Sequence, residues 1–285
     1  MSVITTKTVK TGNGARTFKA NIETFDSTME CVKMCRERKY TDSRFDDMTM
    51  MSMDKKWYGV ENYEEALTLM NDGWNEKVSE LQVALKDCKA LQAQKRIAFR
   101  NEVHGFAPVV PLAILGVPNS MINTAMKPIK AKVISVYYDM VISCGYTAKQ
   151  LIKNGRKMVE TLVKLENMGY RVNLFMTQQY CDSYNGDMLV IKIKSAEQPL
   201  DLKRICFPIM HPAMFRVIGF DWYGKFPKGT YRYGYGSNLP NKVSATEAQE
   251  IMRGLFGKEA VYIHGKLIQD KGVEYIIGAL KGGKL

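Results

Sequence analysis

Apolar residues recur every three or four positions in several parts of this chain, which is the spacing of an amphipathic helix. The longest such pattern covers residues 74–99 and predicts a helix with one buried face. Asn62 and Ser244 are each followed three residues later by Glu, the capping-box arrangement that begins a helix. Further helices are predicted after Asp26 or Ser27 and over residues 147–167 and 273–280.

Short runs of β-branched and aromatic residues predict strands at 133–138, 171–176, 188–194 and 260–264. A short polar connection with Asn185 and Gly186 favours an antiparallel pair between the second and third of them. Because strands alternate with helices from about residue 130, we expect an α/β fold with an open, mostly parallel sheet flanked by helices. Such a Rossmann-like domain would follow an N-terminal helical region.

Glycine and proline residues interrupt any regular pattern between residues 105 and 118. We therefore place a domain boundary here. Residues 1–104 form an N-terminal arm and helical region, and residues 105–285 form the α/β domain.

The 285 residues include 41 Lys and Arg against 29 Asp and Glu, a net charge of +12. This excess favours a polyanionic partner, although it also fits an ordinary solvated surface. The N-terminus lacks the apolar region of a secretory signal, and no stretch approaches the ~20 apolar residues of a membrane span. The cysteines are dispersed, which favours reduced thiols and a cytoplasmic protein without a membrane partner.

Two basic segments are candidates for nucleic-acid binding. Four cations share roughly one face of the predicted 74–99 helix and its end: Lys86, Lys89, Arg96 and Arg100. Residues 222–236 interleave rings with cations, as single-strand binders do: Trp222, Lys225, Lys228, Tyr231, Arg232, Tyr233 and Tyr235. The same alternation also suits a hairpin that covers an apolar patch, or an assembly contact.

Five groups of residues carry a resemblance to a known family: Trp57-Tyr58-Gly59, Tyr63–Leu67 with Gly73-Trp74, Gly116–Met121, Leu165–Val172 and His211–Arg216. Together they resemble a family of uncharacterised proteins from bacteriophages and related mobile elements. The resemblance covers about residues 55–220. It implies a phage source, hence the host cytoplasm or a virion, and no particular activity.

The strand at 133–138, followed by Asp139, a loop and a long helix, resembles the start of a von Willebrand factor A-type domain. That family holds a metal with an Asp-x-Ser-x-Ser loop, matched here by Asp139 and Ser143. Val141 replaces the middle Ser. Since a hard cation needs oxygen ligands, we expect a degenerate, metal-free loop.

Three functions remain open. The preferred one is a non-enzymatic, nucleic-acid-associated accessory protein without a cofactor. The second is a protein–protein interaction or self-association module. The third is a Mg²⁺-dependent hydrolase that uses aspartates at strand ends: Asp182, Asp187, Asp201 and Asp221.

Overall fold

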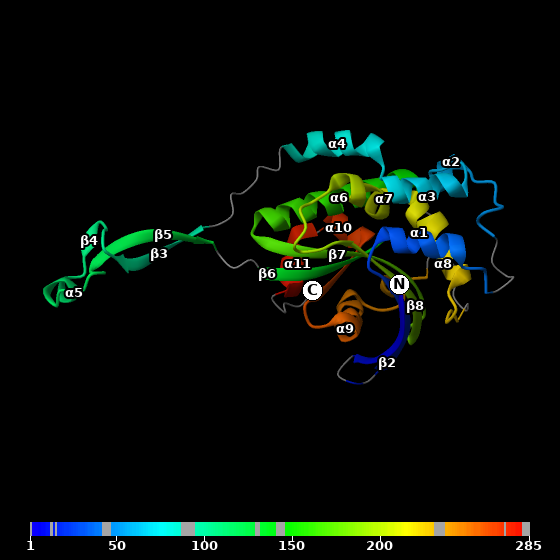
Figure 1. The fold of residues 1–285 in the computed structure, drawn as a ribbon. Helices are drawn as coiled ribbons and strands as arrows, with labels where there is room; N and C mark the ends of the chain where they lie inside the picture. Colours follow the sequence, from blue (N-terminus) through cyan, green and yellow to red (C-terminus); the bar gives the residue numbers. More distant parts are fainter. Residues whose placement is uncertain are drawn as a thin grey trace.

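The computed structural model of the chain (Figure 1) describes residues 2–11, 14, 16–41, 47–86, 95–128, 132–140, 146–230, 237–270 and 272–280. Its centre is a six-stranded sheet with the order β1-β2-β8-β7-β6-β9. These strands are β1 (Val3–Thr11), β2 (Arg16–Phe25), β6 (Lys132–Asp139), β7 (Tyr170–Cys181), β8 (Asn185–Lys194) and β9 (Ala260–His264).

The sheet is mixed. The pairs β1–β2 and β7–β8 are antiparallel, whereas β2–β8, β6–β7 and β6–β9 are parallel. The antiparallel strands curl into a half-barrel (Figure 1), so the prediction of an open, mostly parallel, Rossmann-like or von Willebrand A-like sheet is wrong. The strands β1 and β2 were not predicted, although seven of the nine residues of β1 are β-branched and therefore favour a strand.

The two faces of the sheet are covered differently, because successive side chains of a strand point to opposite faces. Val136 and Tyr138 of β6 belong to the larger core, whereas Tyr137 belongs to the smaller one. In the smaller core the sheet packs against α9 (Ala245–Phe256) and the short turn η2 (Leu239–Asn241). Residues of the following helices build the larger core: α1 (Thr28–Glu37), α3 (Tyr63–Asp72), α4 (Asn75–Lys86), α6 (Ala148–Asn167), α7 (Leu202–Met210), the π-turn η1 (Met214–Ile218), α8 (Gly219–Lys225), α10 (Gly265–Asp270) and α11 (Gly272–Leu280).

The predicted helix starts are confirmed by their caps. The Ser27 and Ser244 hydroxyls accept from the amides of Glu30 and Glu247, 3.3 and 3.2 Å away. Asn62 accepts from the Glu65 amide at 2.9 Å, after the short helix α2 (Lys55–Tyr58). The predicted strands at 133–138, 171–176, 188–194 and 260–264 are likewise present as β6, β7, β8 and β9.

A second, three-stranded sheet projects from this body and stands apart from it in Figure 1. We call residues 95–128 the arm. It contains β3 (Lys95–Glu102), β4 (Ala107–Pro108), β5 (Met121–Pro128) and the short helix α5 (Val110–Ile114), with β5 between β3 and β4.

The arm overturns the prediction of one helix over residues 74–99. The helix α4 ends at Lys86, and β3 begins at Lys95. The strand pairs with β5, from Lys95↔Pro128 to Glu102↔Met121, and local spacing cannot reveal a partner so distant in sequence. The expected boundary at residues 104 and 105 falls inside the arm, and β1 and β2 belong to the main sheet.

Candidate functional site

The four cations predicted to line one helix do not share an element. Lys86 is the last residue of α4, Lys89 lies outside the described residues, and Arg96 and Arg100 lie on β3. Arg100 forms an ion pair with Glu102 at 2.5 Å. The prediction of a continuous basic helix face is therefore wrong, because the chain changes from helix to strand between these residues.

Trp222 and Lys225, expected on the surface, are instead buried in α8, with exposed fractions of 0 and 3%. Bases cannot stack on Trp222 in this position. Its indole N–H donates to Glu23 at 2.9 Å, and Glu23 also accepts two bonds from Arg38, at 2.7 and 2.8 Å. Lys228 is exposed, whereas Tyr231, Arg232, Tyr233 and Tyr235 lie outside the described residues.

Lys225 belongs to a buried polar cluster around Asp221. Its ammonium lies 2.8 Å from an Asp221 oxygen and donates to the Cys35 carbonyl at 2.6 Å. The hydroxyls of Tyr40 and Tyr63 donate to the two oxygens of Asp221, at 2.6 and 2.8 Å. Burial, together with the charge of Asp221, raises the pKa of both tyrosines, so they stay neutral donors. This cluster ties α1 and α3 to α8.

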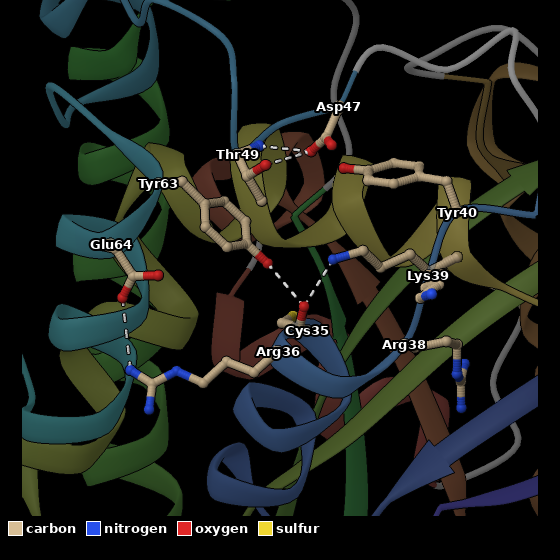
Figure 2. Close-up of a pocket in the computed structure, with 10 residues that line it drawn as sticks. Cys35, Arg36, Arg38, Lys39, Tyr40, Asp47, Thr49, Tyr63 and Glu64 are labelled. Carbon is tan, nitrogen blue, oxygen red and sulfur yellow. Dashed lines mark hydrogen bonds and ion pairs between the residues drawn. The ribbon is translucent and has the colours of Figure 1, made fainter.

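A cavity of about 570 Å³ opens above this cluster (Figure 2). Arg36, Arg38 and Lys39 contribute cations to its wall. The charge of Arg36 is balanced by Glu64 at 3.6 Å, and that of Arg38 by Glu23. Asp221 likewise balances Lys225 at the cavity, and the wall carries the carboxylate of Asp47 as well as the cation of Lys39.

The candidate metal residue Asp139 lies at the carboxyl end of β6 and is fully buried. Its carboxylate accepts bonds from the Tyr262 hydroxyl at 2.5 Å and from the Asn238 amide at 3.1 Å. Ser143 lies outside the described residues. In the part of the chain that the structure describes, no three His, Cys, Asp or Glu side chains are grouped as metal ligands.

The aspartates proposed for a Mg²⁺ site are each engaged in hydrogen bonds or an ion pair within the fold. Asp182 caps the β7–β8 turn and Asp201 caps α7. Asp187 binds Asn21 and Thr230, and Asp221 binds Lys225. The described residues contain no cluster of carboxylates that could hold a metal ion. A magnesium-dependent reaction stays a prediction.

The most unusual surface of the protein is the apolar surface of the arm. None of the residues 99–124 is buried, so the arm has no core of its own there. Seven large apolar side chains are 38–79% exposed: Phe99, Val103, Phe106, Val110, Ile114, Leu115 and Val117. The rings of Phe99 and Phe106 lie 6.3 Å apart, which groups two of them on one side.

The sequence itself carries a signal for this surface. No Asp, Glu, Lys or Arg occurs between Glu102 and Lys127. Loops that only connect secondary structure on a protein surface are usually polar, so an uncharged stretch of this length indicates a contact surface. The prolines and glycines of this stretch favoured its interpretation as a domain boundary.

The fold and this surface define an α/β protein with a mixed, curved sheet and a projecting apolar β arm. The family described as a domain of unknown function, DUF7192, matches residues 6–272, and the chain belongs to this family. No curated protein and no solved structure matches the chain. In the described residues, no helix is long and apolar enough to cross a membrane.

Proposed function

We propose that this protein is an assembly module that pairs with a second copy of itself through the arm. The observation that carries the proposal is the exposed apolar surface of residues 99–117, presented away from the body. Exposed apolar patches of this kind mark interaction sites, because water disfavours them unless a partner covers them.

A partner would also stabilise the arm itself. Small β structures that lack a buried face are marginal in water. The arm has no buried residue between 99 and 124, and among the described residues its order β3-β5-β4 leaves β3 paired on one side only. A partner that covers Phe99, Phe106 and Leu115 supplies the missing core.

A second copy fits the size and chemistry of this surface. The exposed fractions of the seven side chains correspond to an area on the order of 800 Å², close to what one partner contributes to a standard interface. Two identical arms related by a two-fold axis each supply such an area. The absence of charged side chains between Glu102 and Lys127 means that no like charges would face each other within the contact itself.

The sequence motifs that resemble phage and mobile-element proteins support placing such a module in a phage-encoded complex or virion. Self-pairing through the arm does not depend on that source.

Light scattering after size-exclusion chromatography tests the proposal. We expect the wild-type chain to elute as a dimer at high concentration, and the double variant Ile114→Asp/Leu115→Asp as a monomer. Both side chains are more than 70% exposed, so the body should stay folded. Met50→Asp is the matched control, because Met50 is 84% exposed on the body.

A wild-type chain that stays monomeric at high concentration contradicts the proposal. A dimer that both the arm variant and the Met50 control leave intact contradicts it equally, since the contact then lies elsewhere.

A further inference from the structure

One face of the β1–β2 hairpin is exposed toward its tip, whereas further along the same face Glu23 is buried and bound to Trp222 of α8. Residues directly opposite each other in an antiparallel pair share a face, so the pairs Thr6↔Asn21, Thr8↔Lys19 and Lys10↔Thr17 lie on one side. Thr6, Thr8, Lys10, Thr17 and Lys19 are all exposed. The opposite side, with Phe18, Ala20 and Ile22, packs in the core that contains α9.

The chain after α8 extends this face. The Asn21 amide donates to the Lys228 carbonyl at 3.1 Å and to Asp187 at 3.0 Å. Thr230 donates its amide and its hydroxyl to the second Asp187 oxygen, at 2.7 and 2.9 Å. Lys228, which is exposed, is thereby held beside the hairpin.

We call the surface made by Thr6, Thr8, Lys10, Thr17, Lys19 and Lys228 the hairpin face. Its cations are not neutralised, since Lys10, Lys19 and Lys228 form no ion pair with any described residue. The only acidic residue of either strand is Glu23, which is buried and bound to Arg38 and Trp222. The neighbouring carboxylate of Asp187 is fully buried and is occupied by Asn21 and Thr230. The exposed groups of the hairpin face are therefore ammonium groups and hydroxyls.

We propose that the hairpin face binds the backbone of single-stranded nucleic acid. Lysine ammonium groups and threonine hydroxyls are the donors that proteins direct at phosphate oxygens. A basic surface can follow the backbone of a flexible single strand without hydrogen bonds that read the base sequence.

This proposal is independent of the arm and of self-pairing. It also differs from the two basic segments that the sequence suggested, because Lys10 and Lys19 were not among the predicted residues. Only Lys228 is common to both sets.

The affinity of the full chain for a fluorescein-labelled oligothymidylate, measured by anisotropy between about 50 and 200 mM salt, tests the proposal. Each phosphate contact on a single strand contributes about 0.7 to the slope of log affinity against log salt. We expect Lys10→Gln/Lys19→Gln/Lys228→Gln to lower the magnitude of that slope by about 2 and to weaken binding at least tenfold at low salt. Lys19→Gln alone should lower it by about 0.7.

The matched control is Lys33→Gln/Lys55→Gln/Lys157→Gln, which removes the same charge from lysines paired with Glu37, Glu61 and Glu160. It should leave the slope unchanged. Equal losses in both triple variants, or no binding by the wild type, overturn the proposal. A duplex of the same length that binds as tightly as the single strand overturns the preference for single strands.

Discussion

Three charged side chains in the core of this protein each have dedicated partners. Glu23, Asp221 and Lys225 are at most 3% exposed, and each accepts or donates two or more hydrogen bonds. A buried charge without such partners is strongly unfavourable, so these residues are held by the fold and are not free to bind a ligand.

Lys225→Met should lower the free energy of unfolding by roughly 3–5 kcal/mol, because it leaves the buried Asp221 carboxylate without its cation. Urea denaturation measures this loss. The double variant Asp221→Asn/Lys225→Met should recover part of it, because no uncompensated charge remains. A Lys225→Met variant as stable as the wild type would show that Asp221 has another cationic partner.

His211 provides a pH-dependent contribution to stability. Its ring is buried between Trp74, at 4.5 Å, and Phe207, at 5.0 Å between ring centroids. Its Nδ1 accepts the Ala213 amide at 3.1 Å. Burial lowers the pKa of His211 to about 4, below the usual value of 6.5.

The unfolded chain therefore binds a proton at His211 between about pH 6.5 and 4, whereas the folded chain does not. We expect stability to fall as the pH drops through this window, and His211 alone to account for about 2 kcal/mol between pH 7 and 5. The variant His211→Asn should lose that part of the pH dependence in urea denaturation. His104→Gln is the control, since His104 is exposed on the arm and should leave the slope as it is.

At the scale of elements, the close approach of α6 to α7 depends on Gly155. A Cβ atom at this position would lie 2.4 Å from the Ile209 carbonyl oxygen and 2.6 Å from the Met210 Cα. Both are backbone atoms, which cannot move aside without shifting α7. The residue thus sets the distance between the two helices.

Gly155→Ala should therefore destabilise the protein by about 1–3 kcal/mol, although Ala is the better helix former. Gly278 in α11 is the matched control, because a Cβ there meets nothing within 4 Å. Gly278→Ala should raise stability by about 0.5–1 kcal/mol. Thermal denaturation of the two variants distinguishes them, and a neutral Gly155→Ala would contradict the close packing.

At the scale of the whole molecule, the body and the arm differ in what stabilises them. The body has two apolar cores on the faces of one sheet, whereas residues 99–124 of the arm bury no side chain. Stability that depends on a partner copy rises with protein concentration by mass action.

We therefore expect the thermal unfolding midpoint of the wild type to rise with protein concentration, as measured by differential scanning calorimetry. The Ile114→Asp/Leu115→Asp variant should show a midpoint that does not change with concentration. Equal concentration dependence in both proteins would place the source of the effect outside the arm tip.

Local chemistry in the sequence determined where most helices and the strands β6 to β9 lie. The caps at Ser27, Asn62 and Ser244 act on amides three residues away, so the information is contained in neighbouring residues. The same holds for the connection between β7 and β8, where Asn185 and Gly186 marked an antiparallel pair that the structure confirms, although both residues belong to the start of β8.

Only the tertiary structure decided which strands pair, which charged residues are buried and which apolar ones are not. The strand β2 lies beside β8, across more than half of the chain, and β3 becomes a strand through its pairing with β5. The sequence pattern indicated surface positions for Trp222 and Lys225. In the structure both are buried, because Trp222 donates to Glu23, which is far away in sequence, and Lys225 pairs with Asp221. Pairing and burial depend on groups brought together from distant parts of the chain, and no local pattern records them.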